Sequence, residues 1–210
     1  MEQYWDTKII SAMNERLDAE EPVGEGLKEE IRPETSEQPD LNQPLIVING
    51  ERVPFGERSI LDDRLVIIVP KTFHEMTPEM ASQKYPSEHR PKLILTNGEN
   101  TINLSFNHTA DTIKADEFDV LMEQMAKILK QTQKIIEWIE QGVRELGDKK
   151  VGYFEFVTPV INANLYNLFF FAELEGTLLL VTFNCLNQEK EAWRPVAKSM
   201  LDSIRFVKEG

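Results

Sequence analysis

The chain has 210 residues, of which 41% are hydrophobic and 28% are charged. This length is enough for one domain with an apolar core, and the composition excludes both wholesale disorder and a membrane-embedded body. The formal net charge of −13 argues against nucleic acid as a partner, because a negative surface repels phosphate groups and no basic cluster offsets it.

The chain begins with a segment whose apolar residues recur at helical spacing. Trp5, Ile9, Met13 and Leu17 lie on one face, so residues 1–20 are predicted to form an amphipathic helix. A helix this short is marginal in water unless its apolar face packs against something. Three interpretations remain open: the helix packs on its own domain, docks on a partner, or pairs with a second copy of the chain.

Residues 21–43 combine proline, glycine and acidic residues with few large apolar groups. The first 44 residues hold twelve acidic and four basic residues, so most of the negative charge belongs to this end. Such a segment cannot bury enough apolar surface to offset the entropy of ordering it. We therefore expect an acidic flexible linker over 21–43, followed by a folded domain over 44–210.

The opening residues show neither the basic start nor the apolar run of a secretory signal. No later stretch approaches the roughly 18 consecutive apolar residues of a spanning helix. These patterns predict a cytoplasmic protein without membrane insertion. The single cysteine, Cys185, ends a predicted strand and is interpreted as a small buried hydrophobic residue.

Turn signals divide the first half of the domain into strands. Asn49-Gly50 follows an apolar run and predicts a tight hairpin turn. A second pair, Asn97-Gly98, joins the predicted strands 92–95 and 101–106 in a hairpin. A further strand over 65–69 ends at Pro70, and Thr77 is placed to cap a short helix that has proline at its first position. In the strand 101–106, apolar and polar residues alternate, which predicts one buried face and one wet face.

The second half of the domain opens with the longest helical pattern. Apolar residues from Phe118 to Leu129 line one side of about three turns. Whether residues 134–142 continue this helix or form a strand is left open by the sequence. Strands over 151–157, 165–174 and 177–183, a helix over 189–202 and a last strand over 204–207 complete the pattern. This order predicts an α+β sandwich in which a mostly antiparallel β-sheet is covered by helices.

Five features appear in the order known from one superfamily. They are the strand that ends at Pro70, an Asn-Gly hairpin, a central helix, the long paired strands from Tyr153 to Phe183, and a closing segment from Trp193 to Phe206. Over about residues 58–207 this layout resembles the PsbP-like superfamily, whose fold is shared by the PsbP photosystem subunit, the Ran-binding Mog protein, DcrB-type proteins and Eag-type secretion chaperones. The resemblance implies a PsbP-like α/β/α sandwich that binds other proteins without catalysis.

We expect on this basis an adaptor or chaperone that engages a protein client, in a secretion or assembly system. Tyr166 and Phe170 lie in a run of aromatic residues, and three successive phenylalanines cannot all point to one side of a strand. Tyr166 and Phe170 are therefore candidate partner contacts, beside Trp5, Ile9, Met13 and Leu17 of the N-terminal helix. Trp138, like Trp5, is a candidate contact between subunits because tryptophan is enriched at interfaces, and burial in the core is its alternative. The alternative for the phenylalanines is that helices cover both faces of the sheet.

Two other classes of function are weighed against client binding. A self-assembling structural subunit would use the N-terminal helix to build a homo-oligomer. An enzyme would need a general base, for which His74 beside Glu75, His89 and His108 are candidates. No nucleophile or second ligand is placed by spacing near any of them, so no catalytic residue, metal site or cofactor is predicted.

Overall fold

The computed structural model describes residues 38–86, 90–113 and 118–207. Its largest element is a seven-stranded antiparallel sheet with the strand order β5-β6-β7-β11-β10-β9-β8. Its strands are β5 (His74–Glu75), β6 (Leu93–Thr96), β7 (Asn103–Thr112), β8 (Glu137–Leu146), β9 (Lys149–Val160), β10 (Ala163–Leu174) and β11 (Thr177–Leu186).

Two smaller sheets complete the strands. One has the order β12-β4-β3, and the other is the β1–β2 hairpin. Their bounds are β1 (Ile46–Ile48), β2 (Glu51–Val53), β3 (Phe55–Ile60), β4 (Leu65–Pro70) and β12 (Arg205–Phe206). The helices are α2 (Pro78–Lys84), α3 (Phe118–Thr132) and α4 (Lys190–Asp202), and the short 3₁₀ helix η2 (Asn187–Glu189) leads into α4.

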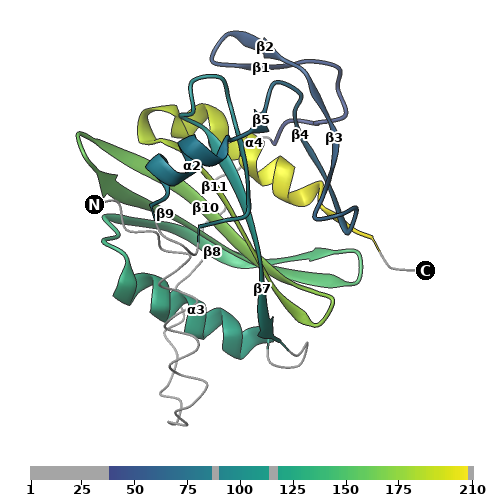
Figure 1. Ribbon diagram of the computed structural model, residues 1–210, viewed down its shortest axis with the longest axis vertical. Coiled ribbons are helices and arrows are strands. Elements are labelled where there is room, and N and C mark those ends of the chain that lie inside the picture. The colour runs from purple at the N-terminus through teal and green to yellow at the C-terminus, as the bar shows by residue number, and fades with distance from the viewer. Residues whose placement is uncertain (1–37, 87–89, 114–117, 208–210) are drawn as a thin grey trace.

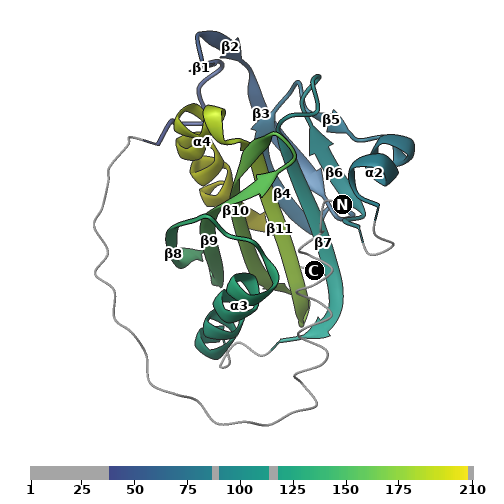
Figure 2. The ribbon, with the colours of Figure 1, turned by 90° about the vertical axis from the view of Figure 1, so that its left-hand side faces the viewer.

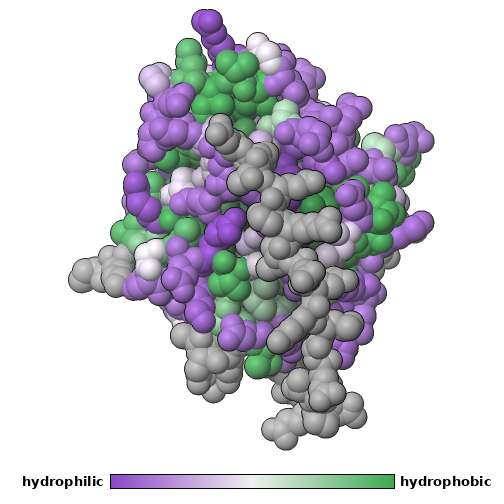
Figure 3. Space-filling model, turned by 180° about the vertical axis from the view of Figure 1, so that it is seen from behind, coloured by the Kyte–Doolittle hydropathy of each residue, from purple (hydrophilic) through white to green (hydrophobic). Residues whose placement is uncertain are grey.

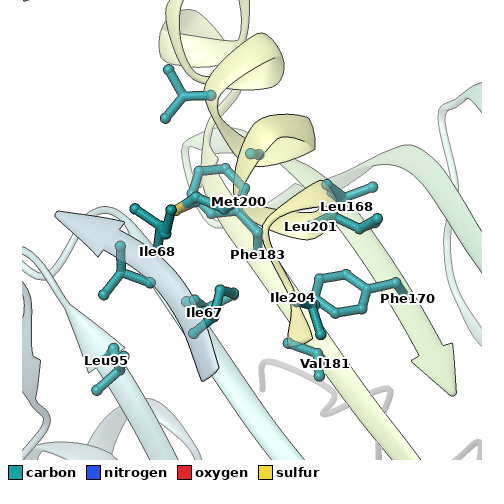
Figure 4. Close-up of a cluster of buried hydrophobic side chains, with 14 of the residues drawn as sticks. Ile67, Ile68, Leu95, Leu168, Phe170, Val181, Phe183, Met200, Leu201 and Ile204 are labelled. Carbon is teal, nitrogen blue, oxygen red and sulfur yellow. The ribbon is translucent and has the colours of Figure 1, made fainter. Parts of the chain in front are cut away.

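The seven-stranded sheet is covered on both faces. Figures 1 and 2 show α3 against one face and α4 against the other. The main core joins α4 and the β3–β4 hairpin to the sheet, and Figure 4 shows Met200 and Leu201 of α4 turned toward the strands that carry Phe170 and Phe183. A second cluster packs α3 on β9, β10 and β11, and a third packs α2 on β6. The predicted α+β sandwich is confirmed.

The local signals in the sequence correspond to the observed elements. Asn49 and Gly50 both have positive φ, as a two-residue hairpin turn between β1 and β2 requires. Thr77 caps α2 by accepting a hydrogen bond from the Met80 N–H, and Pro78 is the first residue of the helix. The apolar face of α3 is buried as expected, but the helix ends at Thr132 and a strand begins at Glu137. Residues 137–142 are therefore strand.

Asn97-Gly98 joins β6 to β7 as expected, in a loop where the Asn97 side chain accepts hydrogen bonds from the N–H groups of Thr101 and Ile102. Two expectations need correction. The second face of β7 is not wet, since Asn103 is buried and joined to Thr96 and to β11 by side-chain hydrogen bonds.

The second correction concerns the end of the predicted linker. Leu41 is buried in the main core, and the carbonyl of Pro39 accepts a hydrogen bond from the Ser199 hydroxyl on α4. The folded part thus begins before residue 44. The predicted helix over 1–20 and the linker up to residue 37 lie outside the described residues.

The neighbours of Gly152 on β9 leave no room for a side chain at this position. A Cβ at this position would stand 2.5 Å from the Met122 sulfur and 2.5 Å from the buried Phe171 ring. We expect Gly152→Ala to lower the free energy of unfolding by about 2 kcal/mol, within the range for overpacking a core. Gly98→Ala is the matched control, because no atom of the described residues lies within 4 Å of its Cβ position. Urea unfolding of both variants checks this, and equal stabilities would contradict it.

Candidate protein-binding surface

Strand β8 is a long edge of the seven-stranded sheet. It pairs with β9 through a turn at Gly147, whose φ of +66° favours glycine, and β8 ends the strand order on that side. A register shift between Trp138 and Glu140 leaves Ile139 as a bulge in the pairing. Among the described residues, the outer side of β8 pairs with no other strand, so its backbone can accept a further strand.

Apolar side chains lie along this edge. Ile136, just before the strand, is 52% exposed, and Val143 in its second half is 40% exposed. Trp138 is half-buried and packs on Phe154 and Phe156, with ring centroids 5.6 and 6.0 Å away. We call Ile136, Trp138 and Val143 together the β8 edge.

The C-terminal part of α3 reaches the same place. Lys130 Nζ lies 4.5 Å from the centroid of the Trp138 ring, which is a cation–π contact. Trp138 and the phenylalanines beneath it belong to the cluster that packs under α3. The tryptophan is therefore fixed in position and still keeps part of its surface open, which is the usual state of an aromatic contact residue at an interface.

The opposite side of β8 is held by a cluster of charges under α4. Glu140 of β8 accepts from Lys198 at 2.7 Å and from Arg194 at 2.9 Å, and the Tyr153 hydroxyl donates to it at 2.6 Å. Burial alone would raise the pKa of Glu140, but the hydrogen bonds from Lys198 and Tyr153 and the nearby positive charges lower it overall. Burial and the bond to Glu140 raise the pKa of Tyr153, which stays protonated.

Glu155, on β9, completes this cluster and is fully buried. Its two carboxylate oxygens lie 2.7 Å from Arg194 Nε and 2.8 Å from Lys198 Nζ. The Tyr166 hydroxyl donates to Glu155 at 2.8 Å, and burial raises the pKa of Tyr166. Two carboxylates thus face two cations, so the cluster is balanced in charge and fastens α4 to β8 and β9.

The predicted partner contacts separate into three groups. Trp138 lies on the β8 edge and keeps exposed surface. Tyr166 and Phe170 are buried in the main core, so in this structure no partner reaches them, and the alternative that helices cover both faces holds here. The remaining residues, Trp5, Ile9, Met13 and Leu17, lie outside the described residues.

Sequence reasoning missed two parts of this region. The exposed Ile136 and Val143 were not singled out, because residues 134–142 had no assigned structure and the predicted strands resumed only at residue 151. The charge cluster was also missed, although Glu155 stands alone in an apolar run and Arg194 and Lys198 are one helical turn apart. A lone carboxylate in a buried strand signals a buried cation nearby.

Several chemical features of the described residues bear on other functions. Cys185 is buried and its burial raises the pKa of the thiol, which matches the expected hydrophobic role. Within the described ranges, no group of three histidine, cysteine or acidic side chains is placed to hold a metal ion. No helix in the same ranges is long and apolar enough to cross a membrane.

No family model matches the chain, and no curated protein matches it. Solved structures do resemble it. CyanoP, the cyanobacterial PsbP of Synechocystis sp. PCC 6803, superposes with a TM-score of 0.52 at 14% sequence identity, over 77% of this chain and 94% of that chain. The fold is PsbP-like. The resemblance predicted from the order of the elements is thereby confirmed for the architecture.

Two more distant structures are also similar to the PsbP-like domain. LpqN, involved in cell envelope biogenesis of Mycobacterium tuberculosis, has a TM-score of 0.46 at 10% identity, over 77% of this chain and 95% of that chain. The type VI secretion immunity protein TplEi of Pseudomonas aeruginosa has a TM-score of 0.37 at 10% identity, over 98% of this chain and 86% of that chain. Likenesses at this level add nothing to the fold assignment, and a PsbP-like fold by itself assigns no function.

Proposed function

We propose that this protein is a non-catalytic adaptor or chaperone that binds an extended segment of a protein client along the β8 edge. The carrying observation is the ten-residue edge strand, whose outer side no other described strand pairs with, and the exposed Ile136 and Val143 beside Trp138. A peptide that adds a strand to such an edge gains main-chain hydrogen bonds, and side-chain contacts give the specificity.

The geometry supports this proposal because the edge is rigid on both faces. Glu140 ties β8 to α4 through Lys198 and Arg194, while Trp138 is packed against the α3 side of the sheet. A preformed edge is already ordered before the client binds, so binding does not have to offset the entropy cost of ordering it. Most unpaired edge strands carry features that prevent pairing with other chains. An edge strand that instead exposes apolar residues is therefore a candidate binding site.

The N-terminal segment keeps its proposed role as a second contact, either with the client or with another copy of the chain. A protein partner, a cytoplasmic location and the absence of catalysis are all part of this proposal. Self-assembly is the second candidate, because the same edge can pair with the β8 edge of a second molecule.

Charged substitutions on the β8 edge test the proposal. We expect Ile136→Lys and Val143→Lys in the full-length protein to reduce recovery of a co-purifying client at least about fivefold, because a lysine that must be desolvated opposes burial at an interface. Recovery from the native cells is measured by quantitative mass spectrometry. Light scattering on the same samples shows whether the partner is another copy of this chain.

Val47→Lys is the matched control. Val47 is 66% exposed on strand β1. Figure 1 places the β1–β2 hairpin at one end of the molecule, away from β8, and Figure 3 shows apolar surface at the same end. The proposal predicts full recovery of the client with this variant. Equal losses with Val47→Lys, or no loss with the two β8 variants, would refute a binding role of this edge.

A further inference from the structure

A second surface, separate from the β8 edge, carries chemistry of its own. A hollow of about 460 Å³ lies between the turn that joins β3 to β4 and the strands β5, β6 and β7. Its volume falls within the range of about 300–1,000 Å³ that is usual for small-ligand sites. The charged and titratable residues that line it are Arg58, Asp62, Arg64, Glu75, Lys92 and His108.

The hollow holds one unmatched cation in a strongly negative protein. Three cations line it, Arg58, Arg64 and Lys92, together with the carboxylates Asp62 and Glu75. Arg64 also pairs with Glu175 at 3.0 Å, and Arg58 lies 3.4 Å from Glu75. Among the described residues, Lys92 is therefore the lining cation that no carboxylate matches. The chain as a whole carries −13. A local excess of positive charge in a concave site draws anions toward it and orients them.

Two of the cations, Lys92 and Arg58, have N–H groups that can donate hydrogen bonds to a ligand. Lys92 is exposed and, within the described part of the chain, makes no hydrogen bond or ion pair. Arg58 donates from Nη1 to the Phe73 carbonyl at 3.0 Å, which fixes its side chain. Its Nη2 is 3.4 Å from a carboxylate oxygen of Glu75, whose side chain is 65% exposed, so this pair is weak and easily replaced by a ligand.

Arg64 serves to hold the walls of the hollow together. Its Nε donates to the Leu61 carbonyl at 2.7 Å, and its Nη1 donates to Glu175 at 3.0 Å in the turn between β10 and β11. Arg64 Nη1 also lies 3.4 Å from His108 Nδ1. The other ring nitrogen of His108, Nε2, lies 3.2 Å from the Leu174 carbonyl oxygen and 2.7 Å from the Thr177 hydroxyl.

The turn between β3 and β4 is strained. Leu61, Asp62 and Asp63 have φ values of +56°, +56° and +67°, a conformation that residues other than glycine rarely adopt in succession. The bond from Arg64 to Leu61 keeps the turn in this form. Strained backbone of this kind gathers at binding sites, where the surrounding contacts maintain it. The strain is an observation independent of the charges.

We propose that this hollow binds a carboxylate group, with Lys92 Nζ and Arg58 Nη2 as the donors. The single unmatched cation, Lys92, suits a singly charged carboxylate better than a phosphate dianion. Leu93, which is partly buried, supplies apolar surface in the lining, so the proposed carboxylate is one on a short aliphatic body. A free carboxylic acid and an acidic side chain of a peptide both have this chemistry. The site is independent of the β8 edge and of the function proposed for it.

Titrations of isotope-labelled full-length protein test the site by NMR, with three probes. They are 4-methylpentanoate, its uncharged amide, and a capped hexapeptide that contains two glutamates. We expect the acid to shift the amide signals of residues 92, 93 and 108, and the uncharged amide to shift none of them. If the peptide binds more tightly than the free acid, the carboxylate belongs to a protein partner. If the free acid binds more tightly, the ligand is a small molecule.

Matched variants locate the donors. Lys92→Gln and Arg58→Gln are each expected to weaken binding of the tighter probe about fivefold to tenfold, since each removes a charge-assisted hydrogen bond. Lys150→Gln and Arg52→Gln, at exposed positions outside the hollow, are expected to leave it unchanged. Equal shifts from the acid and its amide, equal losses in the control variants, or no binding of either charged probe would overturn the proposal. None of these results would affect client recovery through the β8 edge.

Discussion

Glu155→Gln is expected to lower the free energy of unfolding by about 3 kcal/mol, the lower end of the range for removing one partner of a buried ion pair. The carboxylate is fully buried and is paired with both Arg194 and Lys198. Glutamine has nearly the same shape, so packing is kept and the loss comes from two cations that are left with only Glu140. The lower end applies because these cations keep 18% and 14% of their side-chain surface exposed. Urea unfolding at neutral pH measures the change.

Glu57→Gln is the control for this prediction. Glu57 pairs with Arg205 at 2.7 Å, but both side chains are more than half exposed. A surface pair of this kind contributes between about 0 and 1 kcal/mol, so the control variant should unfold within that range of the wild type. If Glu155→Gln cost less than about 1 kcal/mol as well, the charge cluster would not be what holds α4 on the sheet.

The same cluster gives the wild-type protein a dependence on acid. The pKa of Glu140 is lower in the folded state than in the unfolded chain, in spite of the opposing effect of burial. The stability that this carboxylate contributes is therefore complete above its unfolded pKa and is lost as the pH falls through its folded pKa. In the variant Glu140→Gln, the free energy of unfolding should therefore fall less as the pH is lowered than it does in the wild type. Urea unfolding of both proteins at several pH values measures this difference.

The parts of the fold that follow from short-range signals could be predicted from the sequence. The turn at Asn49-Gly50, the cap of α2 at Thr77 and the apolar face of α3 each depend on residues within a few positions of one another. Their physical causes are positive φ in a tight turn, an unpaired N–H at a helix start and a 3.6-residue period. These causes act in the same way in any fold.

The candidate site could not be predicted to the same extent, because its contacts join distant parts of the chain. Glu155 meets Arg194 across 39 positions, and Glu140 meets Lys198 across 58. The β8 edge depends on the strand order, since the same residues in the middle of the sheet would be covered on both sides. A pattern with a period of two does not reveal which strand lies at an edge.

The run from Phe169 to Phe171 shows what alternation alone leaves undecided. Phe169 and Phe171 pack under α3, and Phe170 points to the opposite face, where α4 and the β3–β4 hairpin cover it. The expectation that successive phenylalanines point to both sides was therefore right. Contact of one of them with a partner was predicted only for the case that no helix covers it. Phe170 is covered in this structure, and which face of a strand is covered is a property of the tertiary structure.

Phe170→Ala is accordingly expected to act on stability and to leave client binding unchanged. The ring is 3% exposed in the main core, and Tyr153 and Val181 are its partners in the neighbouring strands. Removing a buried phenylalanine side chain costs about 3–5 kcal/mol, because the lost apolar contacts leave a cavity. Urea unfolding of Phe170→Ala measures this, and Val47→Ala at an exposed position should stay within about 0.5 kcal/mol of the wild type. Client recovery, corrected for the folded fraction, should equal that of the wild type. A variant that kept its stability and lost the client would instead make Phe170 a contact residue, in a conformation where α4 has moved away from the sheet.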